Sequence, residues 1–316
     1  MNDAVGGLTK DGPLLCGGYN RESGYDWDPD YVSNDCFTLH NSKFVATYVK
    51  LQSERNKASA IVLPNGELWI HGGEARLSKL SSSETVSLQG SKNGMEMEEA
   101  IKRHCSVMIN STTAFVTGGK TWHYSYSTYF VNIINWTWTQ GPQLKETRAD
   151  HGCTVFIHNN GQKYAIVAGG RKGCCTYSST EILDLNNGIL EWTTGKSPKF
   201  APTNRFQNYI SGPELPVQMD SFPLISTSQG IMAVGGWDYT NGRSKDEILY
   251  LKCQDGQNPT HCEWEEYSKK LDVARFAHLV IPLPASYDLC NRNETVQASK
   301  INILSHFSRI FALGRE

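Results

Sequence analysis

The side chains of this chain that are suited to chemistry include nine histidines and nine cysteines. The histidines lack the spacing of a zinc-protease helix, and no Cys-x-x-C pair, serine nucleophile elbow or dinucleotide fingerprint occurs. Gly118-Gly119-Lys120-Thr121 matches the end of a phosphate-binding loop, but Ala114 replaces the earlier glycine that such a loop requires. The sequence therefore predicts no catalytic residue, no metal site and no cofactor.

Two pairs of cysteines are candidate disulfides. Cys253 and Cys262 flank a polar, turn-forming segment, so they would face each other across a strand hairpin. Cys16 and Cys36 would meet if the long loop between them folds back and their strands pair within one sheet. Both bridges are predicted from how the chain is expected to fold back between the two cysteines.

The remaining cysteines bear on the compartment of the protein. Cys105 and Cys153 lie in short apolar runs, where we expect buried free thiols that behave as small hydrophobic side chains. Three more have no assigned role: Cys174, Cys175 and Cys290. Because disulfides persist mainly outside the cytosol, the predicted bridges favour a secreted protein. Residues 1–20 contain no secretory signal, so either a leader has been lost or the protein is cytoplasmic.

The main architectural signal is a short apolar run that ends in two glycines and occurs five times. The pairs are Gly17-Gly18, Gly72-Gly73, Gly118-Gly119, Gly169-Gly170 and Gly235-Gly236. Their spacing of roughly 50 residues is too long for a helical or leucine-rich solenoid and fits a four-stranded propeller blade. A side chain would clash where a buried strand turns sharply beside the next blade. Each pair is therefore expected to end a buried strand.

Each glycine pair is followed by a polar loop, a β-rich run and, in most units, an aromatic residue. The clearest examples are residues 128–133 before Trp138, residues 180–185 before Trp192 and residues 247–251 before Trp264. This pattern resembles the kelch-repeat family over residues 3–283. The resemblance implies an all-β fold, a kelch-type β-propeller with five recognisable four-stranded blades.

Another apolar run precedes most glycine strands and would form the inner strand of each blade. A sixth such run, residues 276–281, has no glycine strand behind it. Propellers close by pairing strands from the two chain ends, so this orphan strand predicts a sixth blade whose outer strands come from upstream of residue 1. In the alternative, it packs beside the first blade and a five-bladed ring closes without it. Residues 284–316 would form an irregular tail, either disordered or a short amphipathic helix.

The composition fits one soluble all-β domain. The net charge is −2, and no apolar stretch approaches the ~18 residues of a membrane helix. Nothing suggests nucleic-acid binding, and the oligomeric state stays open. Three glycosylation sequons occur, at Asn110, Asn135 and Asn293. The first two would fall in turns on one face of the ring, so sugars there would leave the opposite face free.

On that opposite face, one rim would collect the loops from second to third strands and from each blade to the next. Six aromatic residues of these loops are candidates for ligand contact: Tyr25, Trp27, Trp122, Tyr124, Trp237 and Tyr239. Aromatic rings suit peptide or glycan contacts. Each ring would alternatively fold back onto the edge of its own blade.

Four arginines stand shortly before inner strands, near the expected mouth of the central channel: Arg55, Arg103, Arg148 and Arg275. A cationic collar of this kind would favour acidic ligands. In the alternative, a residue that recurs once per blade belongs to the blade's own hydrogen bonding, for instance to a loop carbonyl or to Asp150 or Asp272.

The family resemblance implies a non-catalytic interaction module. We expect an extracellular propeller that binds a protein or glycan ligand through the loop rim. The first alternative is an intracellular kelch adaptor separated from its partner domains. A more distant one is a copper-radical oxidase related to galactose oxidase, which requires a Cys–Tyr crosslink, a second tyrosine and two histidines on one face.

Overall fold

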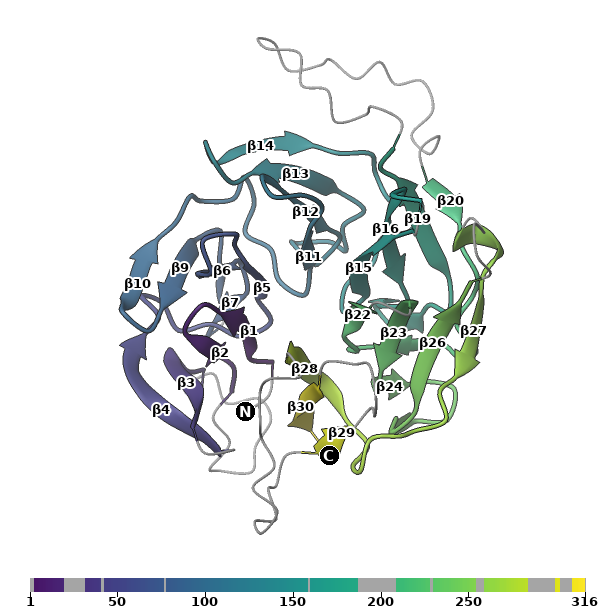
Figure 1. The fold of residues 1–316 in the computed structure, drawn as a ribbon. Coiled ribbons are helices and arrows are strands. Elements are labelled where there is room, and N and C mark those ends of the chain that lie inside the picture. Colours follow the sequence, from purple (N-terminus) through teal and green to yellow (C-terminus); the bar gives the residue numbers. More distant parts are fainter. Residues whose placement is uncertain are drawn as a thin grey trace.

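The computed structural model describes residues 3–19, 32–40, 43–76, 78–158, 160–186, 209–227, 230–253, 259–283, 299–301 and 309–315. Regular structure in these ranges is antiparallel β-sheet, apart from a single 3-10 turn at Pro259–His261. No helix of the described ranges is long and apolar enough to cross a membrane. Figure 1 shows the sheets standing around a common centre.

Five four-stranded meanders follow one another along the chain. The first contains β1 (Val5–Thr9), β2 (Gly12–Cys16), β3 (Asp35–His40) and β4 (Lys43–Lys50). The second contains β5 (Ser59–Val62), β6 (Leu68–His71), β9 (Ser83–Ser87) and β10 (Gly90–Asn93). The third contains β11 (Cys105–Met108), β12 (Thr113–Thr117), β13 (Thr128–Asn132) and β14 (Thr137–Gln140). The fourth contains β15 (Gly152–Ile157), β16 (Lys163–Ala168), β19 (Thr180–Asp184) and β20 (Tyr209–Ser211). The fifth contains β22 (Leu224–Thr227), β23 (Gly230–Val234), β26 (Ile248–Lys252) and β27 (Glu263–Glu266).

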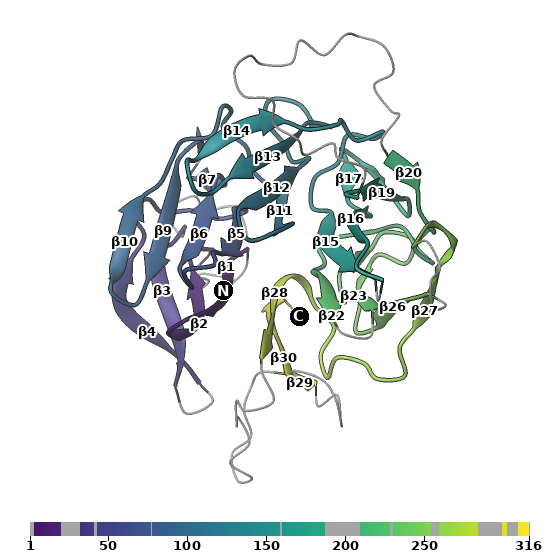
Figure 2. The same ribbon diagram turned by 45° about the horizontal axis from the view of Figure 1, so that its top comes forward.

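The last sheet has three strands, in the order β28 (Phe276–Leu283), β30 (Arg309–Arg315) and β29 (Ser299–Ile301). The strand that pairs with the expected orphan is therefore β30, from the C-terminal segment, and not a strand from upstream sequence. This corrects the expectation of an irregular or helical tail for these residues. Figure 2 shows β28 between β1 and β22 around the centre.

The second strand of each meander is the most buried. All residues of β2, β6, β12 and β23 are buried, because neighbouring sheets cover both faces. The outer strand β4 is largely exposed or half-buried. This gradient explains why the runs before the glycine pairs are continuously apolar whereas the outer strands are not.

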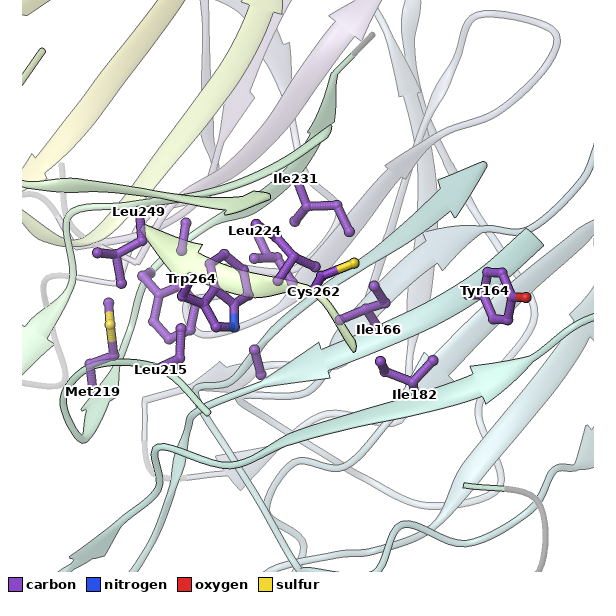
Figure 3. Packing of buried hydrophobic residues seen from close by; sticks show 14 residues of the cluster. Tyr164, Ile166, Ile182, Leu215, Met219, Leu224, Ile231, Leu249, Cys262 and Trp264 are labelled. Atoms are coloured by element: carbon purple, nitrogen blue, oxygen red, sulfur yellow. The ribbon is translucent and has the colours of Figure 1, made fainter. Parts of the chain in front are cut away.

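Hydrophobic clusters between adjacent sheets hold the ring together. Between the fourth and fifth sheets, Ile166 and Ile182 belong to the same buried cluster as Leu249 and Trp264 (Figure 3). Trp264 also donates its indole N–H to the Pro213 carbonyl at 3.1 Å. The predicted aromatic residue of the fifth blade therefore seals the gap to the fourth.

The glycine pairs occupy the predicted strand ends and adopt left-handed backbone angles. Gly169 has φ 63°, and a Cβ there would lie 2.6 Å from the carbonyl oxygen of Met219 in the next unit. The next glycine, Gly170, donates its N–H to that same carbonyl at 2.9 Å. The pair thus brings two units into backbone contact, which a side chain would prevent.

Three disulfides occur in the described residues. Cys16–Cys36 joins β2 to β3, and Cys253–Cys262 closes the predicted hairpin. Both predicted bridges are confirmed.

The third bridge, Cys105–Cys153, corrects the expectation of two buried free thiols. These residues lie on the inner strands β11 and β15 of neighbouring sheets, so their side chains meet across the sheet boundary. Cys174 and Cys175 are exposed and unbridged, and Cys290 lies outside the described residues.

Candidate ligand site at the channel mouth

Six residues at one end of the central channel share an unusual backbone conformation. Their φ angles lie between 49° and 59°, in the left-handed region that side-chain-bearing residues seldom adopt, and they are Asp3, Lys57, Arg103, Asp150, Ser221 and Ala277. Five of them lie two or three residues before an inner strand, and Ala277 is the second residue of β28. We call this set the mouth ring.

Backbone hydrogen bonds connect the mouth ring into a closed circle. The N–H of Arg103 donates to the Lys57 carbonyl at 2.8 Å, and Asp150 N–H donates to the Arg103 carbonyl at 2.9 Å. The same bond recurs from Lys57 to Asp3, Ser221 to Asp150, Ala277 to Ser221 and Asp3 to Ala277. Each sheet therefore presents one side chain to the mouth from a fixed main-chain position, and such strained positions cluster at functional sites.

A second set of mouth residues directly follows the glycine pairs: Tyr19, Glu74, Lys120, Arg171 and Trp237. Short pairings hold this set over the mouth ring. Arg171 begins the hairpin β17 (Arg171–Lys172) and β18 (Cys175–Thr176), and it exchanges two backbone hydrogen bonds with Ala149. Trp237 lies in β24 (Trp237–Asp238), between β21 (Met219–Asp220) and β25 (Arg243–Ser244).

Members of both sets, together with Asp220, Tyr239 and Phe276, line a cavity of about 230 Å³. Its charged lining residues are Asp3, Lys57, Arg103, Arg171 and Asp220. Its aromatic lining residues are Tyr19, Trp237, Tyr239 and Phe276. A small number of charged groups beside aromatic walls is typical of a site for a compact polar ligand.

Asp150 organises the two arginines of the cavity. Its Oδ2 accepts a hydrogen bond from Arg103 Nη1 at 2.6 Å and another from Arg171 Nε at 2.8 Å. Burial opposes ionisation of Asp150, but the two guanidinium groups outweigh it and lower its pKa. Arg171 Nη1 also donates to the Tyr239 hydroxyl at 3.2 Å.

Asp220 lies beside this cluster and is held less firmly. It is 3% exposed, its Oδ2 is 3.4 Å from Arg171 Nε, and that oxygen has no hydrogen-bond partner in the described structure. Burial, with the nearby Asp150 charge, raises the pKa of Asp220 to about 6. A buried carboxyl group with a perturbed pKa in a cavity marks a functional-site candidate.

On the other side of the mouth, the ammonium group of Lys57 donates two hydrogen bonds. Its Nζ donates to Glu74 Oε2 at 3.0 Å and to the Tyr19 hydroxyl at 3.2 Å. Lys102 also pairs with Glu74. The ammonium group of Lys57 therefore faces the cavity from a fixed position.

The channel continues below the mouth as a second cavity of about 330 Å³, lined by the inner strands and by β28. Three mouth-ring residues are each followed in the sequence by a buried histidine: His104, His151 and His278. Burial lowers the pKa of each to about 3, so they are neutral at physiological pH. Their rings approach the first glycine of a pair, which gives them a packing role.

The arginines expected to form a collar divide into two groups. Arg55 and Arg148 are fully buried and bind within the blades. Arg148 donates to the Gly169 carbonyl at 2.7 Å and to Glu181 Oε1 at 2.8 Å, and Arg55 pairs likewise with Gly72 and Glu84. These contacts support the structural alternative for both residues.

Of the other two arginines, Arg275 occupies the same backbone position as Arg55 and Arg148, whereas Arg103 does not. Arg275 is 7% exposed, and its carbonyl accepts the Gly236 N–H at 2.7 Å. Arg103 belongs to the mouth ring and lines the cavity. Only Arg103 of the four therefore reaches the mouth cavity.

The aromatic residues expected to contact a ligand also differ in location. Trp237 and Tyr239 line the cavity, with ring centroids 6.3 Å apart. Trp122 is 88% exposed, with Lys79 Nζ 4.4 Å from its ring centroid, and Tyr124 receives Lys120 in the same way at 4.9 Å. Tyr25 and Trp27 lie outside the described residues.

Two of the three sequons lie in exposed turns of the third sheet. Asn110 follows β11 and Asn135 follows β13, and both turns are at the end of the sheet away from the mouth ring. Asn293 lies outside the described residues. Glycosylation at these positions stays a prediction.

Sequence reasoning missed Asp150 and Asp220 as site residues, together with Lys57 and Arg171. One usable signal was the position directly after a glycine pair, which holds the cavity residues Tyr19, Arg171 and Trp237. A second signal was the position two residues after three of the four recurring arginines, because Lys57 follows Arg55, Asp150 follows Arg148 and Ala277 follows Arg275 at this offset.

Comparisons with known proteins address the fold. No protein-family model and no curated protein sequence matches the chain. A solved structure, described as "Structure of YjhT", is similar with a TM-score of 0.63 and 13% sequence identity, over 89% of this chain and 87% of that chain. Identity at this level shows the fold alone. Together with the all-β sheets around one centre, this similarity shows that the chain has a β-propeller fold.

Proposed function

We propose that this protein is a non-catalytic kelch-type propeller that binds a protein or glycan ligand at the channel mouth. The observation that carries the proposal is the cavity in which Arg103, Arg171 and Asp220 lie beside Trp237 and Tyr239. Binding sites of this kind combine a few oriented polar groups with aromatic surfaces that cover the rest of the ligand. The surrounding hydrogen bonds hold the polar groups in place before a ligand arrives.

The mouth end of the ring is also the end away from the two described sequons. Glycans on Asn110 or Asn135 would leave the cavity accessible. Three disulfides support an extracellular or otherwise oxidising environment. We therefore propose a secreted binding protein, with the intracellular adaptor as the alternative.

A screen of the whole chain against immobilised glycans and peptides tests this function. Hits are then measured with Tyr239→Ala, which removes an aromatic wall that is 37% exposed. Tyr48→Ala is the matched control, because Tyr48 is 84% exposed on β4, far from the cavity lining. Loss of binding in Tyr239→Ala alone supports the proposal. Equal binding by both variants would place the ligand elsewhere.

The copper-radical oxidase alternative is tested separately. Six of the cysteines are in disulfides, and the described residues hold no group of three or more His, Cys, Asp or Glu side chains arranged for a metal. Metal analysis of protein expressed with added copper measures stoichiometric binding directly. One copper per chain, with oxidase activity, would favour the enzyme over the binding module.

A further inference from the structure

The mouth cavity contains more hydrogen-bond donors than its own acidic groups engage. In the described structure Arg103 uses Nη1 for Asp150, whereas Arg171 uses Nε for the acids and Nη1 for Tyr239. Their side chains are 21% and 25% exposed, so the remaining guanidinium N–H groups are partly open to the cavity. Paired guanidinium groups of this kind match the planar geometry of a carboxylate.

Asp150 and Asp220 compete for the same nitrogen of Arg171. Asp150 is well held, at 2.6 Å from Arg103 and 2.8 Å from Arg171. Asp220 is 3.4 Å from Arg171 Nε and keeps one buried oxygen without a hydrogen bond. A buried acceptor without a partner is costly, so Asp220 is the group whose ionisation the site can most easily change.

We propose that the mouth cavity binds its ligand through a carboxylate held by Arg171 and Arg103, and that Asp220 takes up one proton when this carboxylate enters. The inference rests on the proposed function and specifies the chemistry of the ligand. A new anion beside Arg171 repels the Asp220 carboxylate in a poorly hydrated place. Protonation removes that repulsion and turns the unpaired Oδ2 into a possible O–H donor.

The charged groups around Asp220 come from several elements. Arg171 on β17 faces it directly, and Asp150 and Arg103 approach from the mouth ring. Ser221, the next residue, donates a hydrogen bond that favours the ionised form, whereas burial and Asp150 favour the neutral form. The balance already raises the pKa of Asp220 to about 6, so one further negative charge is enough to shift protonation near neutral pH.

The rest of the ligand would lie between the aromatic walls. Trp237 stands against Phe276 with ring centroids 5.2 Å apart, and Tyr239 and Tyr19 carry hydroxyl groups held by Arg171 and Lys57. A compact molecule with one carboxylate and an apolar or hydroxylated body fits this lining. Such a carboxylate has two sources, a sugar acid or an acidic residue of a peptide, and the test separates them.

The proposal predicts a specific dependence of the dissociation constant on pH. Asp220 is protonated in both free and bound protein well below pH 6, so affinity is highest and constant there. Above pH 6 the free protein loses the proton while the complex keeps it, and Kd rises up to about tenfold per pH unit. The rise ends at the higher pKa of Asp220 in the complex.

The experiment is calorimetric titration of the whole chain with glucuronate between pH 5 and 8.5. Glucose is the neutral counterpart, and a doubly capped peptide with a single aspartate is the second carboxylate source. Titrations in two buffers of different ionisation enthalpy report the protons taken up. Asp220→Asn imitates the protonated acid, and Asp246→Asn, a half-buried acid paired with Lys270 and absent from the cavity lining, is the matched control.

We expect one carboxylate probe to bind at least tenfold more tightly than glucose, with nearly one proton taken up near pH 7. Asp220→Asn should bind at pH 8 as tightly as the unchanged protein does below pH 6, without proton uptake, and Asp246→Asn should behave as the unchanged protein. If Asp220→Asn does not fold, the pH profile and proton count of the unchanged protein decide.

Three outcomes would overturn the inference: neither carboxylate probe binding more tightly than glucose, carboxylate binding without proton uptake, or no binding of either carboxylate at millimolar concentration. The proposed function has its own test, because the ligand screen includes neutral glycans and uncharged peptides. A neutral ligand lost in Tyr239→Ala would therefore preserve the binding function and reject the carboxylate and proton mechanism.

Discussion

The backbone N–H of Asp3 lies 3.4 Å from the carbonyl oxygen of Ala277, so a hydrogen bond joins the first sheet to the last. Below this bond, Leu15 shares a buried cluster with Ile281 and Leu283. The ring is therefore closed at its mouth by a polar contact and further down by apolar packing. The same backbone bond recurs between every pair of successive mouth-ring residues.

Replacing Gly169 with alanine should destabilise the fold by more than backbone strain alone. Gly169 and Gly173 have nearly equal φ angles, 63° and 64°, but only Gly169 lies against another unit. Gly173→Ala should cost ~1–2 kcal/mol from its left-handed conformation. Gly169→Ala adds the collision with the Met219 carbonyl, and thermal unfolding compares the two. Equal melting temperatures would show that close contact between units does not require this glycine.

Arg148→Met should lower the free energy of unfolding by about 3 kcal/mol or more. Removing the guanidinium leaves Glu181, only 3% exposed, as a buried carboxylate without its partner. Urea titration measures the loss. Arg76→Met is the control, because Arg76 is 65% exposed in its ion pair with Glu54 and should matter little. A small effect at Arg148 would mean that its buried hydrogen bonds do not hold the blade.

His151→Phe should reduce the acid sensitivity of the protein. In the folded state the pKa of His151 is about 3, below its unfolded value, so the unfolded chain binds more protons between about pH 6.5 and 3. This group contributes full stability above that window and loses about 1.4 kcal/mol per pH unit as pH falls through it.

Phe222, shortly before the fifth sheet, lies against Gly169 as His151 lies against Gly118, so the ring volume is compatible with phenylalanine. Unfolding free energies at pH 7 and pH 5 should therefore differ less in the variant than in the unchanged protein. An unchanged difference would indicate that His151 is not buried in neutral form.

Alkylation without reduction should label Cys174 and Cys175 and leave the three bridged pairs unlabelled. The two thiols are exposed, whereas the other six described cysteines are bonded to each other. Peptide mapping by mass spectrometry reads both results, and a reduced sample is the control. Labelling of Cys105 or Cys153 in the unreduced protein isolated from its native source would contradict their bridge and weaken the case for secretion.

The glycine pairs made the propeller fold predictable because backbone sterics at Gly169 and its equivalents leave a local mark in the sequence. The mouth was harder to predict, because its six residues share a backbone position before or at an inner strand but are of different residue types, so no recurring amino acid marks them. Arg103 was placed with Arg55 although it is the equivalent of Lys57, a shift of two residues. Likewise, contact between neighbouring sheets brings Cys105 to Cys153, and no local pattern records that contact.

In the mouth ring, main-chain atoms make the hydrogen bonds that close the circle, and most of the side chains are left to line the cavity. Its hydrogen bonds use only main-chain atoms, and its six side chains already range from Ala277 to Arg103. Five of these side chains, all except Asp150, line the mouth cavity, so substitution there changes the charge and size of the lining and removes no atom of the backbone hydrogen bonds. The fold thus offers five positions at which the specificity of the cavity can be engineered while the backbone framework of the propeller is kept.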